Sequence, residues 1–395
     1  MKEFRQSVTD PAFVQDPYPF YARLRAAGPI VRWPEAGGLV ATTRDAVDTL
    51  LRDRRFGRAR ADGSPPDYPE HLSGFAALEA HSLLELEPPR HTQLRKLVLR
   101  AFTSRRVAAL APEIEALAET LIDALPEGPF DLLPHFAERL PATIIARLIG
   151  APDADVPDLL AWSHAMVAVY RAARTRAEED AAEAAARAFA AYLDDLIAER
   201  RATPRDDLLS HLLIAEADGQ KLSRDEVVST AILLLNAGHE ATVHALGNGV
   251  KALLETGRIV TAETAEATVE EILRYDPPLH LFTRTAYEDV KLFGHAFAPG
   301  DTVALLLGSA CRDPDLAPDP DRFDPERAPA AHPAFGAGLH FCLGAPLARL
   351  EMRLALPLLF SRLPGLRLTE PPRYAATWHF HGLERLMVAS DTHPA

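Results

Sequence analysis

The feature that most constrains the fold of this chain is one long helical segment between Ser223 and Gly257. Ser223 and Glu226 stand three residues apart ahead of an apolar run, which is the spacing of a capping box that begins a helix. The helical pattern then continues to Glu255, and Gly257 is a residue suited to ending it. About 33 residues, each rising about 1.5 Å, form a rod of about 50 Å that can cross a whole domain.

The rest of the chain predicts a mainly helical fold with a minor β portion. From Pro89 to about Gly257 the spacing of the apolar residues is helical almost throughout. Short strands are predicted at Ile30–Trp33, Leu39–Thr42, Leu292–Phe297 and Val303–Leu307. A length of 395 residues by itself favours two or three domains, although no linker composition divides the sequence.

The composition of the chain limits which binding partners and which cellular compartment are expected. The formal net charge is −14, from 42 Lys and Arg against 56 Asp and Glu, which disfavours nucleic acid and anionic membranes as partners. The first twenty residues carry Pro11, Pro17 and Pro19 among charges and contain neither an apolar signal segment nor a spanning helix. Two cysteines provide no disulfide framework. We therefore expect a cytoplasmic protein.

The middle of the long helix carries small and polar residues that are costly inside a buried helix. An interior glycine costs about 1 kcal/mol relative to alanine, and buried polar groups need partners. Successive residues are about 100° apart, so one shallow face combines Gly238, Ala241, Thr242, Ala245 and Gly249. Close packing of a second helix explains this face as well as a flat cofactor does.

Cys342 lies in a glycine-rich stretch that leads into an amphipathic segment. The stretch reads Phe335-Gly336-Ala337-Gly338-Leu339-His340-Phe341-Cys342-Leu343-Gly344. A thiolate at the head of a helix is stabilised by the helix dipole and by free backbone N–H groups. A lone cysteine is more often a small buried apolar residue. A dinucleotide-binding fingerprint would need Gly or Ala at position 341, and a zinc site would need further ligands nearby.

The stretch resembles the haem-binding loop of the cytochrome P450 family, Phe-Gly-x-Gly-x-His-x-Cys-x-Gly, and fills every position of that pattern. The resemblance extends over nearly the whole chain. It implies a single large P450-type domain over residues 1–395, mainly α with a minor β portion, with the long central helix over the haem. It also implies haem b as the cofactor, with the Cys342 thiolate as the iron ligand and Phe335 and Gly336 beside it.

Other segments resemble the parts of this family that bind the haem propionates. Propionates are anionic, so burying them requires cations or strong hydrogen-bond donors. The segment Glu87–Arg95 resembles the family's His-x-x-x-Arg helix start, and Phe282-Thr283-Arg284 resembles the family's propionate arginine. The residues that the resemblance assigns to the propionates are His91, Arg95, Arg284 and His340.

The centre of the long helix resembles the family's oxygen-binding motif, Ala/Gly-Gly-x-Asp/Glu-Thr-Thr. Carried over by position, Gly238 lines the oxygen pocket and Glu240 is the acid that passes protons inward. Ala241 stands where the family normally has threonine, and Thr242 lies about 100° further round the helix. The departure leaves haem binding untouched, but a substrate hydroxyl, ordered water or peroxide must then replace the missing hydroxyl in oxygen activation.

A buried structural triad is also implied. From spacing alone, Arg274 can pair with Glu270 or with Glu271, and either pair can be a solvated surface feature. The family pattern Glu-x-x-Arg selects Glu271. Pro320-Asp321-Arg322-Phe323 resembles the family's Pro-x-Arg-Phe, which makes Arg322 the third member.

The resemblance implies a haem-thiolate monooxygenase that inserts one oxygen atom from O2 into an apolar or amphiphilic small molecule. The chain beyond Ala345 is too short for a flavin or iron–sulfur domain. Electrons are therefore expected from a separate ferredoxin or flavodoxin and its NAD(P)H reductase, and we expect a monomer. Two alternatives stay open: a peroxide-driven haem-thiolate oxygenase, which Ala241 favours, and a non-catalytic haem-binding or sensor protein.

Overall fold

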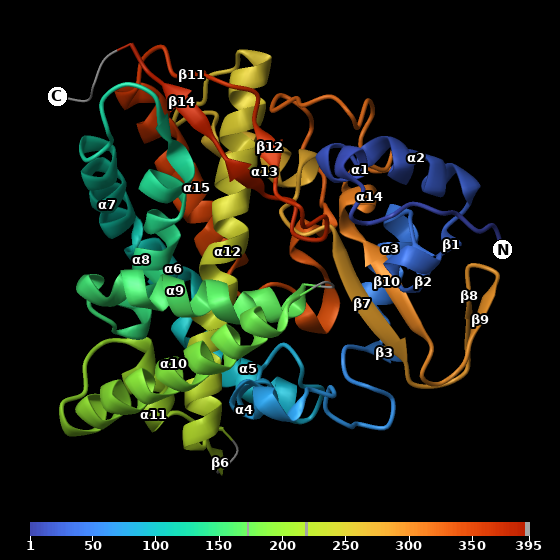
Figure 1. Cartoon of the computed structure of the whole chain (residues 1–395), viewed down its shortest axis with the longest axis horizontal. Helices are drawn as coiled ribbons and strands as arrows, with labels where there is room; N and C mark the ends of the chain where they lie inside the picture. Colours follow the sequence, from blue (N-terminus) through green and yellow to red (C-terminus); the bar gives the residue numbers. More distant parts are fainter. Residues whose placement is uncertain (172–173, 218–219, 392–395) are drawn as a thin grey trace. The chain divides into compact units, whose positions relative to one another are not determined.

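The computed structural model describes residues 1–171, 174–217 and 220–391. The contacts within the chain divide it into two compact units that alternate along the sequence. Unit 1 contains residues 1–57, 110–140 and 241–395, and unit 2 contains residues 58–109 and 141–240. The boundary at residues 240 and 241 falls inside one helix, α12 (Arg224–Thr256), whose chain contributes to both units (Figure 1).

Helix α12 confirms the predicted long helix at both ends. The Ser223 N–H donates to the Glu226 carboxylate at 2.9 Å, and the Glu226 N–H donates to the Ser223 hydroxyl at 3.2 Å, so the capping box is complete. At the other end Gly257 has a φ of +65°. The N–H of Arg258 donates to the carbonyl of Leu253 at 2.9 Å, the long-range bond of a Schellman motif.

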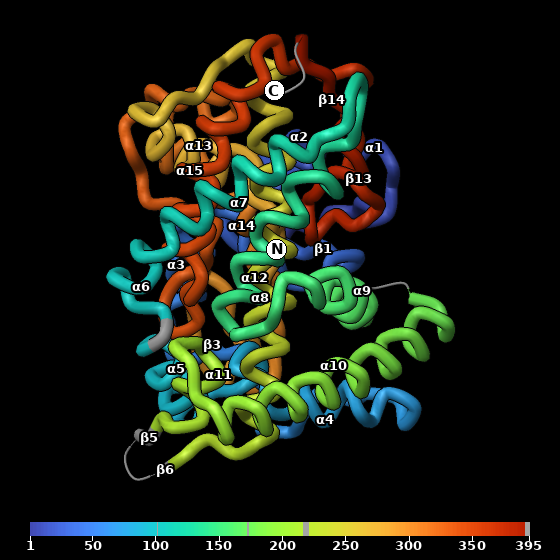
Figure 2. Tube along the Cα trace, turned by 90° about the vertical axis from the view of Figure 1, so that its left-hand side faces the viewer, coloured from blue at the N-terminus to red at the C-terminus, as the bar shows by residue number. Residues whose placement is uncertain are grey.

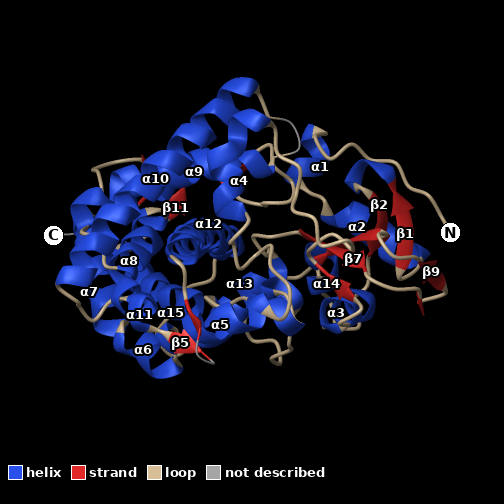
Figure 3. Cartoon of the chain, turned by 90° about the horizontal axis from the view of Figure 1, so that it is seen from below, coloured by secondary structure: helices blue, strands red, loops and turns tan. Residues whose placement is uncertain are grey.

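Unit 1 contains a five-stranded sheet in the order β1–β2–β10–β7–β3, in which only the β2–β10 pair is parallel. Figure 3 labels β1, β2 and β7 of this sheet, drawn in red. In the β7–β10 pair, Arg284 lies opposite Val303. The apolar core beside the sheet includes Val47, Leu50 and Leu305. The strands are β1 (Ile30–Trp33), β2 (Gly38–Ala41), β3 (Phe56–Gly57), β7 (Leu281–Ala286) and β10 (Thr302–Leu306).

The helices of unit 1 come from segments both before and after α12 in the sequence. Helix α15 packs against α7 and α13, and α3 packs against α14. In a smaller three-stranded sheet β14 lies between β11 and β4, and in a two-stranded sheet β12 pairs with β13. The helices are α1 (Pro11–Gln15), α2 (Tyr18–Ala27), α3 (Arg44–Arg52), α7 (Ala111–Asp123), α13 (Ala265–Tyr275), α14 (Leu307–Cys311) and α15 (Ala345–Arg362). The short strands are β4 (Phe130–Asp131), β11 (Arg367–Leu368), β12 (Arg373–Tyr374), β13 (Leu383–Arg385) and β14 (Met387–Ala389).

One predicted strand is wrong in form. The segment Leu292–Phe297 is a hairpin, in which β8 (Val290–Leu292) pairs with β9 (His295–Phe297). Phe293 and Gly294 both have positive φ, 51° and 75°, which is the two-residue turn that matches the twist of the strands. Phe293 stands where such a turn usually has Asn or Asp, so the turn could not be predicted from the residue type at this position. The other three predicted strands are confirmed to within one residue at each end.

Unit 2 is almost entirely helical. Helix α10 packs along α9 and also contacts α4 and α11 (Figure 2). Strands β5 (Glu216–Ala217) and β6 (Gln220–Lys221) pair in an antiparallel sheet of two strands. The helices are α4 (Ser73–Glu79), α5 (Arg90–Ala101), α6 (Ser104–Ala109), α9 (Val156–Val167), α10 (Arg176–Ala202) and α11 (Leu208–Ile214), with α8 (Arg139–Ile149) beginning just before the unit boundary.

The mainly helical fold with small sheets confirms the predicted fold class. None of the described helices combines the length and the apolar character that crossing a membrane requires. The prediction of one domain over residues 1–395 stays a prediction.

Candidate functional site

The cysteine loop joins two 3₁₀ turns to helix α15 in unit 1. The turns span Pro333–Phe335 and Gly338–His340, and α15 begins three residues after Cys342. The backbone N–H of Cys342 donates to the carbonyl oxygen of Phe335 at 3.0 Å, which closes the loop. Cys342 is half-buried. The structure therefore places its sulfur at the start of a helix, as the sequence indicated.

Gly338 is the residue on which the shape of this loop depends. Its φ is +68°, and a Cβ atom there would lie 2.5 Å from the carbonyl oxygen of Leu51 and 3.0 Å from Cα of Arg52. Because both atoms belong to the backbone at the end of α3, no side-chain rotation relieves the clash. The glycine allows the cysteine loop to lie directly against that backbone.

The second cysteine has a different environment. Cys311 is fully buried at the end of α14, and burial raises the pKa of its thiol to about 12. A thiol that stays protonated is neither a good metal ligand nor a nucleophile. Of the two cysteines in the chain, Cys342 is therefore the one suited to bind a ligand.

Strand β7 runs beside the cysteine loop and adds a cation to it. The ring of Phe282 on β7 would lie 3.1 Å from a Cβ atom on Gly336. Two residues later, Arg284 is buried, and its Nη1 donates to the carbonyl of Thr283 at 2.8 Å. The loop itself contributes His340 at the end of the second turn.

This donor set fits a haem. Unit 1 combines a half-buried thiol, a buried guanidinium and an imidazole in neighbouring segments. A haem iron takes a thiolate as its axial ligand, and the propionates take cations and donors. The Phe335 ring adds an apolar surface, which is held by the Arg349 guanidinium 4.5 Å above its centroid.

Two further residues that are predicted to bind the haem propionates lie in unit 2. Helix α5 carries His91 and Arg95 one turn apart, as the sequence indicated. His91 is buried and Arg95 is half-buried. The structure thus presents the predicted propionate residues as two groups, one in each unit.

The predicted oxygen motif on α12 is divided at the unit boundary. Gly238 and Glu240 belong to unit 2, while Ala241, half-buried, and Thr242, buried, belong to unit 1. A Cβ atom on Gly238 would lie 3.1 Å from Cγ1 of Ile145 on α8. Close helix packing therefore accounts for this glycine, which was one of the two explanations of the shallow helix face.

The buried ion pair predicted at the end of α13 is present. Arg274 donates to both carboxylate oxygens of Glu271 at 2.7 and 2.8 Å, and both side chains are nearly inaccessible to solvent. Glu270 instead accepts from Arg349 on α15 at 2.5 and 2.9 Å. The choice of Glu271 over Glu270 is therefore confirmed.

The third member of this triad was assigned wrongly. The Arg322 side chain is 64% exposed, and only its backbone carbonyl accepts from Arg274, at 3.2 Å. Arg327 takes the position instead: its side chain is 10% exposed and its Nε lies 3.4 Å from the Glu271 carboxylate. The available signal was a second Pro-x-Arg, Pro325-Glu326-Arg327, which lacks the following phenylalanine.

Sequence reasoning missed a buried polar cluster around Asp276 in unit 1. Its carboxylate is hydrogen-bonded by the hydroxyls of Tyr18, at 2.6 Å, and Tyr374, and by Nδ1 of His381 at 2.8 Å. Burial by itself would raise the pKa of Asp276, but His381, His280 and other neighbours outweigh it and hold that pKa below its ordinary range. The members come from residues 18 to 381, so no local spacing marks the cluster.

Known proteins resemble this chain over nearly its whole length. The sequence model of the family described as Cytochrome P450 matches residues 259–364. Cytochrome P450 monooxygenase PikC of Streptomyces venezuelae is 41% identical over 373 residues, which are 91% of this chain and 87% of that protein. Vitamin D(3) 25-hydroxylase of Pseudonocardia autotrophica is 39% identical over 366 residues, 90% of this chain and 88% of that protein. The crystal structure of P450BioI in complex with hexadec-9Z-enoic acid ligated acyl carrier protein matches with a TM-score of 0.90 at 33% identity, covering 96% of this chain and 100% of that one. The chain therefore belongs to the cytochrome P450 family and is a cytochrome P450 monooxygenase.

Proposed function

We propose that this monooxygenase holds haem b through the Cys342 thiolate and inserts one oxygen atom from O2 into an apolar or amphiphilic small molecule. The observation that carries the proposal is the cysteine loop. Its thiol is half-buried at the start of α15, in a loop that packs too tightly for a side chain at Gly338. The positive end of α15 favours the deprotonated sulfur that binds iron.

The other residues of the loop and the propionate group act by binding and orientation. A thiolate-ligated haem, when bound, supplies the oxygen-activating chemistry. Phe335 and Gly336 then form the surface beside the sulfur. The cations and donors for the propionates are Arg284, His340, His91 and Arg95.

On α12 the proposed roles concern protons. Glu240 accepts a proton from the solvent side and passes it inward, and Gly238 keeps the helix surface shallow. Ala241 has no hydroxyl to hold that proton near the reacting oxygen, and the buried Thr242 lies on a different helix position. A hydroxyl of the substrate or an ordered water therefore completes the relay.

Substrate and electron supply follow from the relatives and from the residues. One relative is named as a vitamin D(3) 25-hydroxylase, and P450BioI binds a hexadecenoic acid group on its acyl carrier protein. These names support an apolar or amphiphilic substrate. Electrons come from a separate ferredoxin or flavodoxin with its NAD(P)H reductase, and the chain acts as a cytoplasmic monomer of one domain, without nucleic acid or membrane as a partner.

Ala241 also supports a second candidate, a peroxide-driven haem-thiolate oxygenase. The missing hydroxyl removes one aid to proton delivery, and peroxide already carries the protons that this step requires. Turnover by the same preparation with reduced ferredoxin or with hydrogen peroxide separates the two. A higher rate with peroxide would replace the first proposal.

The carbon monoxide difference spectrum of the dithionite-reduced protein tests the iron ligand. We expect the strongly red-shifted Soret band of a thiolate-ligated haem in the wild type and in the matched variant Cys311→Ser. Cys342→Ser should lose that band. A retained red-shifted band in Cys342→Ser would refute the ligand assignment, and absence of any haem signal after reconstitution would refute the cofactor.

A further inference from the structure

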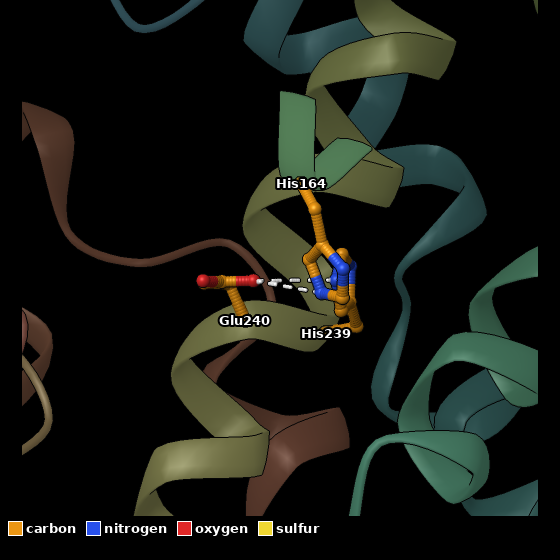
Figure 4. A group of neighbouring side chains, drawn as sticks. All are labelled: His164, His239 and Glu240. Atoms are coloured by element: carbon orange, nitrogen blue, oxygen red, sulfur yellow. Dashed lines mark ion pairs between the residues drawn. The ribbon is translucent and has the colours of Figure 1, made fainter. Parts of the chain in front are cut away.

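A second group of metal-binding side chains lies within unit 2. His164 on α9 and His239 and Glu240 on α12 turn toward one another, with the carboxylate facing both rings (Figure 4). Glu240 Oε2 lies 3.4 Å from Nε2 of His239 and 3.8 Å from Nε2 of His164. The three ligand atoms all lie within 4.8 Å of one another.

The protonation of His239 is fixed by the backbone. Its Nδ1 lies 2.8 Å from the carbonyl oxygen of Leu235, which can only accept, so Nδ1 carries the hydrogen. In the neutral ring Nε2 then carries no hydrogen, and its lone pair is directed toward Glu240. The side chain of His239 is 0% exposed, and Nε2 has no hydrogen-bond partner among residues 1–171, 174–217 and 220–391. A buried lone pair that faces a carboxylate is unfavourable unless a positive charge lies between the two atoms, and either a proton or a metal ion supplies it.

We propose that His164, His239 and Glu240 bind a divalent cation of the zinc class. In a tetrahedral zinc site with bonds of about 2.0–2.2 Å, neighbouring ligand atoms are about 3.3–3.5 Å apart. The pair of His239 and Glu240 already has this separation at 3.4 Å. His164 lies 3.8 Å from Glu240, and its ligand atom lies within 4.8 Å of that of His239. Its side chain is 47% exposed, so the ring is free to rotate closer and leaves a route for the ion from solvent.

The surroundings resemble those of known zinc sites. A ligating histidine usually donates its other N–H to a carbonyl or carboxylate, and His239 does so to Leu235. Three protein ligands leave a fourth position for water or another small ligand. Because Glu240 is also the proposed proton donor, an occupied site would compete with that role; this consequence rests on the proposed function, whereas the binding does not.

The buried cluster of Asp276, His280 and His381 lacks this property. Both ring nitrogens of His280 lie within hydrogen-bonding distance of tyrosine hydroxyls, and those of His381 face Asp276 and the carbonyl of Val14. A metal there would have to break these bonds. The two clusters share residue types, but only the one on α9 and α12 has a buried lone pair directed at its neighbours.

Isothermal titration of the haem-loaded, untagged protein with zinc chloride tests the site. We expect one saturable zinc per chain, an affinity at least tenfold weaker in His164→Ala, and a similar loss in Glu240→Gln. The matched control is His211→Ala, which removes another histidine whose Nε2 contacts a carboxylate, that of Asp206 at 2.7 Å, and should bind zinc like the wild type.

Absence of saturable binding at zinc concentrations up to about 1 mM would overturn the proposal. An unchanged affinity in His164→Ala would overturn it as well. The carbon monoxide spectrum of each variant is recorded beside the titration. A normal spectrum with no zinc binding refutes this site alone, whereas a missing haem band refutes the proposed function.

Discussion

Replacing Gly338 by alanine should destabilise the protein more than the same replacement of a left-handed glycine that has open surroundings. The backbone at φ +68° costs about 1–2 kcal/mol for a residue with a Cβ. The new methyl would lie 2.5 Å from the Leu51 carbonyl oxygen, about 1 Å inside ordinary contact. Overpacking of this kind costs about 1–3 kcal/mol. The expected loss in the free energy of unfolding is therefore about 2–5 kcal/mol.

Gly257→Ala is the matched control, because it separates the two contributions. Gly257 has nearly the same φ, +65°, but no atom lies within 4 Å of the position that its Cβ would take. It should lose only the backbone part, about 1–2 kcal/mol. Gly338→Ala must then exceed it by at least about 1 kcal/mol.

Urea unfolding of the haem-loaded variants, followed by far-ultraviolet circular dichroism, measures this difference through the transition midpoint. The Soret absorbance followed in the same titration reports whether haem leaves earlier in Gly338→Ala, as a distorted cysteine loop requires. Equal midpoints for the two variants, with equal retention of haem, would show that the loop is not packed against the end of α3 as described.

Three further substitutions test other parts of the structure. Arg327→Ala should lower the free energy of unfolding by about 3 kcal/mol, because it leaves part of a buried carboxylate uncompensated. Replacement of the exposed Arg322 by alanine should change it by no more than about 0.5 kcal/mol. A larger loss in Arg322→Ala than in Arg327→Ala, measured by urea unfolding, would restore Arg322 as the third member of the triad. Burial raises the pKa of Glu351 to about 8, so stability from this carboxyl is present below about pH 4 and is lost as the pH rises toward 8. Glu351→Gln should match the wild type at pH 4 and exceed it by about 3 kcal/mol at pH 7, and identical pH profiles would contradict this. Ala241→Thr should raise the fraction of NAD(P)H electrons that appear in product; unchanged coupling would favour a relay completed by the substrate or by water.

The parts of the fold that could be predicted are those specified by neighbouring residues. Ser223 and Glu226, three positions apart, each accept a hydrogen bond from the other's backbone N–H, and Gly257 ends the helix through its own positive φ. Both ends of α12 can therefore be predicted without knowing which distant segment packs against them. The cysteine loop was readable for a different reason. Its glycines, histidine and cysteine are required within ten consecutive positions, and together they form a specific pattern.

The parts that could not be predicted depend on which distant segment arrives at a residue. The protonation of His239 follows from a bond within its own helix, but its importance appears only when α9 brings His164 to the other side. The Asp276 cluster likewise draws on segments separated by more than two hundred residues. No periodicity carries that information.

The two carboxylates before Arg274 show why spacing alone cannot decide between such alternatives. Glu270 and Glu271 are both within helical reach of the same guanidinium, and in an isolated helix either pair contributes only about 0.2–0.5 kcal/mol. In the structure Glu271 is buried with Arg274, where removal of one partner costs about 3–5 kcal/mol. Glu270 is 35% exposed and is held by Arg349 from α15, in a range where ion pairs contribute about 1 kcal/mol or less. The ion pairs of two neighbouring glutamates therefore contribute to stability by amounts that differ several-fold. The difference arises because α15 and the segment that carries Arg327 pack against them.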